Sequence, residues 1–132
     1  MLPVGSGTLY VVIPEDEPWP VGLDEVETLL RQRWPTAMVT REVSAVTGIQ
    51  YLSFDVELNG AARWGTYSQR TGFSLSEGFP ADWADTVAWF LGLLPAGTRA
   101  LAAAGGNLEL VPLPPSPSAD EVRALYERLL EG

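Results

Sequence analysis

One stretch of the sequence constrains the fold more than any other: YLSFDVELNGAARWGTY, residues 51–67. Its first half alternates apolar and polar side chains, which is typical of an antiparallel strand with one buried face. Asn59-Gly60 then tolerates the positive φ angles of a two-residue type I′ turn, and the chain returns over Ala62–Ser68. The segment predicts a hairpin within an antiparallel sheet. The polar face of its first strand carries Tyr51, Ser53, Asp55 and Glu57.

Periodicity and turn signals predict the remaining strands. An apolar run at Thr8–Ile13 and a β-branched run at residues 38–46 indicate two of them. Phe73–Leu75 is interpreted as an extension of the return strand past Gly72. Residues 99–113 favour a pair of hairpin strands over a helix, because the glycine pair within them would break a helix.

Three helices complete the pattern. Leu23–Trp34 places apolar side chains on one stripe, and its Glu27 and Arg31 are spaced to form an ion pair. A second helix is predicted over Ala81–Leu94. The last begins at Ser118, where the SADE spacing makes a capping box, and it is expected to pair Arg123 with Glu127 outside.

The resulting order is β-α-β-β-β-α-β-β-α, and 132 residues suit one domain. We therefore predict a single α+β domain over residues 1–132. Its architecture is a two-layer sandwich, in which helices cover one face of a mostly antiparallel sheet.

The residue types exclude much chemistry. The chain has no cysteine, histidine or lysine, so thiolate, imidazole and Schiff-base catalysis are absent. Zinc or copper sites built on histidine or cysteine are excluded as well. Asp55 and Glu57 stand about 7 Å apart along one strand, a separation that a carboxylate-dependent hydrolase can use. Because the alternation places both in solvent, we expect no catalytic residue, no cofactor and no metal site.

Charge bears on partners and location. The net charge is −9 and the pI about 4.3, the reverse of the basic footprint that nucleic-acid binding requires. An acidic surface serves solubility or favours a basic protein partner. The N-terminal stretch lacks the pattern of a secretory signal, and the longest apolar run is too short to span a membrane. We expect a cytoplasmic protein without membrane contact.

The segment PADWADTVAWFLGLLP, residues 80–95, has more apolar residues than one buried face needs. A helical projection puts Trp83, Val87, Phe90, Leu91 and Leu94 on a core stripe. The opposite side carries Asp82, Asp85, Thr86, Trp89 and Leu93. Either the C-terminal helix or the loop around Trp19 covers Trp89, or Trp89 anchors an exposed patch rimmed by carboxylates that suits a basic partner.

An acidic run precedes Trp19 and consists of Glu15, Asp16 and Glu17. It lacks the alternating spacing and the central glycine of a calcium-binding EF-hand loop. It is either a solvated loop beside a buried tryptophan or an acidic contact surface that Trp19 anchors. Tyr51 with Asp55 and Glu57 is a further candidate for partner contact.

Two resemblances rest on YLSFDVELNGAARWGTY, on PADWADTVAWFLGLLP and on the capped last helix. After the first strand, the order of elements is similar to that of bacterial type III secretion chaperone-like domains. The size, the acidity and the missing catalytic groups resemble small immunity proteins of bacterial polymorphic toxin systems. The second resemblance implies a non-enzymatic protein that binds and neutralises a basic toxin such as a nuclease. The first implies a dimeric chaperone for an extended client segment, so monomer and homodimer both stay open.

Overall fold

The structure is a computed structural model, and it describes residues 7–12, 19–58, 60–70, 72–78, 80–94, 98–105, 107–114 and 116–131. The candidate acidic run Glu15, Asp16 and Glu17 lies outside the described residues. The side chain of Asp82 also lies outside them, although its backbone belongs to a helix.

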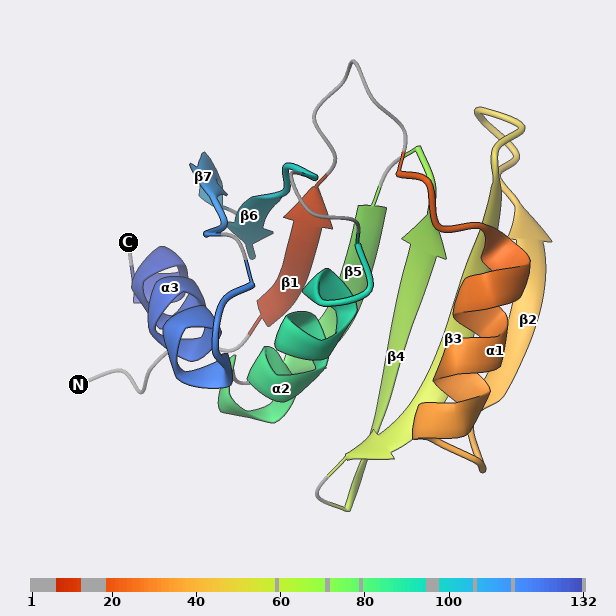
Figure 1. Cartoon of the computed structure of the whole chain (residues 1–132), viewed down its shortest axis with the longest axis horizontal. Helices are drawn as coiled ribbons and strands as arrows, with labels where there is room; N and C mark the ends of the chain where they lie inside the picture. Colours follow the sequence, from red (N-terminus) through yellow and green to blue (C-terminus); the bar gives the residue numbers. More distant parts are fainter. Residues whose placement is uncertain are drawn as a thin grey trace.

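Seven strands form one antiparallel sheet in the spatial order β2-β3-β4-β5-β1-β6-β7 (Figure 1). The strands are β1 Gly7–Val12, β2 Met38–Val43, β3 Gln50–Leu58, β4 Ala61–Ser68, β5 Gly72–Gly78, β6 Leu101–Ala104 and β7 Asn107–Pro112. The helices are α1 Leu23–Arg33, α2 Pro80–Leu91 and α3 Ala119–Glu131, and all three lie over the same face of the sheet (Figure 1). The predicted α+β class and sandwich architecture are confirmed.

The central hairpin has the predicted register. Leu52 is paired with Tyr67 and Phe54 with Gly65, and these four residues are buried beneath the helices. Gly60 has a φ of 80°, as the second position of a type I′ turn requires. Gly65 is needed because an added Cβ would stand 2.5 Å from the Phe54 ring. The alternation in the sequence thus divides the sheet into a helix-covered face and a second face.

Aromatic rings fill the layer between sheet and helices. Phe73 on β5 and Phe90 on α2 stack with centroids 4.3 Å apart and planes at 5°. The indole N–H of Trp83 donates to the Ser76 carbonyl over 3.0 Å, so this buried ring leaves no donor unpaired. These contacts fix α2 on the middle of the sheet.

One strand differs from the sequence-based expectation. Phe73–Leu75 does not extend the return strand but belongs to β5, which turns back and pairs antiparallel with β4. Gly72 begins β5 with a φ of 109°. Because Gly72 turns the chain rather than interrupting one strand, the sheet has one more strand than predicted. The strand predicted at residues 38–46 also ends earlier, at Val43, where a turn begins.

The C-terminal predictions hold with one exception. Residues 101–112 form the predicted hairpin. Ser118 and Glu121 bond reciprocally over 3.0 and 3.1 Å, which confirms the capping box. Arg123, however, pairs with Asp120 at 3.8 Å and not with Glu127. Both partners are one helical turn from Arg123, and the acidic first turn supplies the one that is used.

Candidate protein-binding face

No helix of the described chain lies over the second face of the sheet, which we call the open face. In register, Met38 of β2 lies beside Asp55 of β3, and Asp55 lies beside Trp64 of β4. Glu57 is the diagonal neighbour of Trp64, within reach of a large ring. We call Met38, Asp55, Glu57 and Trp64 the acidic–aromatic patch.

The patch exposes side chains that folded proteins usually cover. Trp64 is 55% exposed and Met38 67%, and both carboxylates are exposed. The backbone N–H of Trp64 donates to the Ser76 hydroxyl over 2.9 Å, which fixes this strand position against β5. A tryptophan held on a rigid strand can enter a partner's pocket with little loss of conformational freedom.

The charges of the sheet are sorted by face. Glu42 of β2 joins Asp55 and Glu57 on the open face, since it is paired in register with Tyr51. The two arginines in the described strands, Arg41 and Arg63, are paired with the buried Leu52 and Val56 and so belong to the helix-covered side. The strand positions described on the open face therefore carry acidic charge alone.

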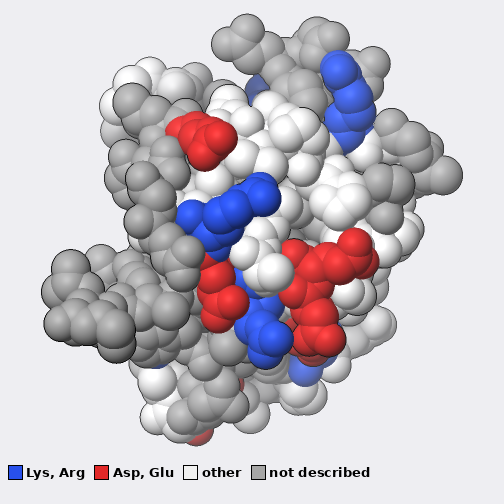
Figure 2. Space-filling model, turned by 90° about the vertical axis from the view of Figure 1, so that its left-hand side faces the viewer, with Lys and Arg blue, Asp and Glu red and all other residues white. Residues whose placement is uncertain are grey.

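Of these two arginines, Arg41 is already paired with acidic side chains of α1. Arg41 forms ion pairs with Asp24 and with Glu27, and Arg31 contacts Glu27 at 3.2 Å, as predicted. Around α3 and β7, acidic and basic side chains are interleaved on the surface (Figure 2). The open face differs from these surfaces because its described strand positions carry no arginine beside the carboxylates.

Two of the candidates from the predicted second helix, Trp89 and Leu93, pack against the rest of the fold. The ring of Trp89 is half-buried and meets Trp34 edge-on, with centroids 6.2 Å apart. The guanidinium of Arg33 lies 4.8 Å from the Trp89 ring and 2.8 Å from the Asp85 carboxylate. Trp89 is therefore covered from the end of α1, which is neither of the two elements that the sequence proposed.

α2 ends at Leu91, earlier than the predicted Leu94, and both Thr86 of α2 and Leu93 in the turn that follows also pack. Leu93 is half-buried against the core, and Thr86 is buried although the projection placed it opposite the core stripe. The reason is that α2 packs both on the sheet and on α3, so it buries more than one stripe. Of the two aspartates on the predicted acidic face, the described side chain is that of Asp85, whose charge Arg33 offsets.

The prediction that Trp19 anchors an exposed contact surface is wrong, because the residue is buried. Its ring is 2% exposed and stacks on Tyr67 at 6.2 Å and 14°. Its backbone N–H donates to the Gln69 carbonyl over 2.9 Å, and its indole N–H points to the Arg99 carbonyl at 3.4 Å. These contacts bring the segment at residue 19 into the core, as the buried alternative predicted.

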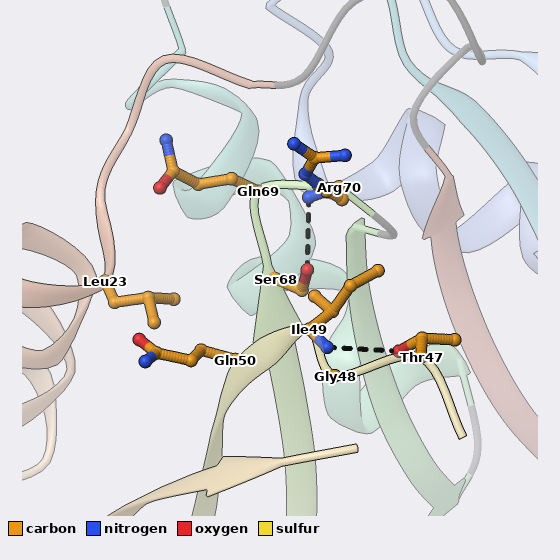
Figure 3. Close-up of a pocket in the computed structure, with 8 residues that line it drawn as sticks. All are labelled: Leu23, Thr47, Gly48, Ile49, Gln50, Ser68, Gln69 and Arg70. Carbon is orange, nitrogen blue, oxygen red and sulfur yellow. Dashed lines mark hydrogen bonds between the residues drawn. The ribbon is translucent and has the colours of Figure 1, made fainter. Parts of the chain in front are cut away.

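Two pockets flank the β2–β3 turn. The first, of about 420 Å³, is lined mainly by polar groups, among them Gln50, Gln69 and Arg70 (Figure 3). The second, of about 660 Å³, opens at the candidate Tyr51 and is bordered by Thr66 and Ser68. Both are open hollows at the end of the sheet, and among the described residues that line them there is no carboxylate.

The described residues show no constellation for catalysis. They contain no group of three or more acidic side chains that could hold a metal ion. Burial raises the pKa of Tyr67 and Tyr126 well above the ordinary tyrosine value. Each hydroxyl donates to a carbonyl over 2.6 Å, Tyr67 to Val21 and Tyr126 to Tyr10, so both tyrosines serve packing. Asp55 and Glu57 face solvent together on β3.

The sequence predicts Tyr51, Asp55 and Glu57 as contact candidates on this face, but it does not predict Met38 or Trp64 there. The position of Trp64 could have been predicted from the turn between the two strands. A two-residue turn at Asn59-Gly60 fixes the register, and counting outward from it places Trp64 opposite Asp55. Met38 had no comparable signal, because the register of β2 depends on a longer turn whose geometry the residues do not dictate.

Comparisons with known proteins give no match from which a function could be assigned. No protein-family model matches the chain, and no curated protein or solved structure matches it. Among the described helices, none combines the length and apolarity needed to cross a membrane.

Proposed function

We propose that this chain is a non-enzymatic protein-binding module that acts in the bacterial cytoplasm as an immunity protein against a basic toxin. The observation that carries the proposal is the open face of the sheet. Its described charges are all acidic, and two of them, Asp55 and Glu57, neighbour the exposed Trp64. Aromatic anchors within a charged rim are the usual composition of an interface hot spot.

The mechanism is occlusion. A toxin that binds nucleic acid carries a basic groove, and the acidic face competes with the phosphate backbone for that groove. Asp55 and Glu57 meet arginines or lysines of the toxin, while Trp64 and Met38 fill an apolar depression between them. The carboxylates accelerate encounter, and the buried ring slows dissociation.

The test co-produces the chain with the basic C-terminal domain of a secreted protein encoded next to its gene. We expect a stable complex and restored growth of the producing cells. Retained toxicity without complex formation contradicts the proposal.

A second arm assigns the binding to the open face. Trp64→Ser together with Glu57→Gln should abolish protection, whereas Asp85→Asn on α2 is the matched control and should leave protection intact. Both sets of changes lie at exposed positions, so they should not unfold the chain.

A further inference from the structure

The two edges of the sheet differ in how they are protected. β7 forms one edge, and it contains Pro112 and pairs with β6 through an irregular register. Both features hinder the addition of another strand. β2 forms the other edge, without proline, and its pairing with β3 runs unbroken from Met38 to Val43. Met38 and Val43 are 67% and 61% exposed.

The pairing of β2 with β3 shows which backbone N–H and C=O groups of β2 face away from the sheet. The ladder with β3 continues into the turn, where the Ser44 N–H donates to the Ile49 carbonyl over 3.0 Å. Because hydrogen-bonded pairs alternate in an antiparallel ladder, the residues on either side of each inward pair turn outward. Val39, Arg41 and Val43 therefore point their N–H and C=O groups away from the sheet. The Val39 carbonyl agrees, since it accepts from the exposed Arg31 at 3.4 Å.

The side chains beside this edge define what fits there. A strand added to β2 places every second side chain on the open face, next to Met38, Thr40 and Glu42. The remaining side chains meet Val39, Arg41 and Val43 on the helix side, where Arg41 is already paired with acidic residues of α1. The edge thus suits basic residues at alternate positions with uncharged ones between them.

We propose that the β2 edge binds an extended segment of the basic partner as an eighth strand of the sheet. The segment carries arginine or lysine at every second position, so that its charges continue the acidic face. Main-chain hydrogen bonds from Val39, Arg41 and Val43 hold it. A second copy of this chain is the less suitable occupant, because each copy carries a net charge of −9. The inference rests on the proposed function, since it names how that partner binds.

The experiment uses the full chain and a synthetic peptide of about ten residues in which arginine alternates with threonine or valine. The key variant is Val43→Pro, which removes one outward N–H without breaking a bond to β3. Val43→Ala is its matched control, because it trims the side chain and keeps the N–H. We expect Val43→Pro to weaken peptide binding at least about tenfold and Val43→Ala less than about twofold. A peptide with glutamate in place of arginine should not bind.

Amide hydrogen exchange in the wild-type complex supplies a measurement that needs no variant. The amides of Val39, Arg41 and Val43 should exchange more slowly with the arginine peptide bound. Unchanged exchange there, equal binding to Val43→Pro, or equal binding of the glutamate peptide overturns the inference. So does a dimer of the free chain that Val43→Pro converts to a monomer, because a second copy then occupies the edge.

The outcomes also separate this inference from the proposed function. If the basic toxin domain binds in a Trp64-dependent manner and tolerates Val43→Pro, the open face stands and the edge fails. If the peptide protects the β2 amides but no toxin domain binds, the edge stands and the immunity function fails.

Discussion

Gly72 occupies a position that only glycine fits. Its φ is 109°, and an added Cβ would lie 2.1 Å from the Val11 carbonyl oxygen of the neighbouring strand. Gly72→Ala should therefore destabilise the fold by about 3 kcal/mol or more, through backbone strain together with displacement of β1. Urea unfolding measures the change in free energy.

Gly48 is the matched control for this prediction. Its φ is also positive, at 73°, but nothing lies within 4 Å of an added Cβ. Gly48→Ala should cost only the backbone preference, roughly 1 kcal/mol. Equal losses for the two variants would show that the close approach of β1 and β5 contributes nothing.

Because Tyr67 and Tyr126 are buried, the stability of the fold should depend on pH in the alkaline range. Desolvation raises the pKa of both hydroxyls, and the Glu25 carboxylate adds to the effect at Tyr67. Above pH 10 the unfolded chain releases these protons while the folded chain keeps them. The tyrosines' contribution is therefore complete below that pH and declines above it, by about 1.4 kcal/mol per pH unit for each tyrosine.

Chemical denaturation at a series of pH values measures this decline. Tyr126→Phe should remove one tyrosine's share of the slope. It should also cost about 1 to 3 kcal/mol at neutral pH, because the Tyr10 carbonyl loses its buried donor. An unchanged slope in Tyr126→Phe contradicts the assignment.

Among the elements, α2 contacts the C-terminal end of α1 through Asp85 and Trp89. Arg33 lies against the rings of Trp34 and Trp89 and pairs with Asp85. Trp89→Leu keeps some apolar volume but loses the ring contacts, so it should destabilise the fold by about 1 to 3 kcal/mol.

The affinity of Trp89→Leu for the partner distinguishes scaffold from interface. If α2 is scaffold, the folded variant binds the toxin domain as tightly as the wild type does. A large loss of affinity without a loss of stability would move the binding surface to α2. Calorimetry of the variant and of its complex measures both quantities.

The elements also show what sequence could and could not predict. Local signals sufficed for the β3–β4 hairpin, for the capping box of α3 and for the hairpin at residues 101–112. The turn before β5 has no asparagine–glycine signal, so β5 was merged with β4. Trp89 could not be placed because its partner, Trp34, is distant in sequence, and the two rings meet only once the sheet brings the end of α1 close to α2.

For the whole molecule, the net charge of −9 does not by itself locate a site. The fold does so by sorting charge: on the helix side Arg41 compensates acidic residues of α1, while the strands expose carboxylates on the open face. Association with a basic partner should therefore slow as salt increases, because screening shortens the reach of these carboxylates to about 8 Å at physiological ionic strength. Stopped-flow mixing at several salt concentrations measures the association rate, and a rate independent of salt contradicts electrostatic steering.

The most direct test of the open face is the dissociation constant of the toxin complex for a variant that changes only this face. Asp55→Asn, Glu57→Gln and Trp64→Ser together remove both carboxylates and the tryptophan of the acidic–aromatic patch while leaving the core unchanged. We predict a loss of affinity of about 100-fold or more, equivalent to about 3 kcal/mol, with unchanged unfolding free energy. An affinity within about twofold of the wild type would contradict the proposal that this face binds the partner, because a tenfold loss already corresponds to only about 1.4 kcal/mol.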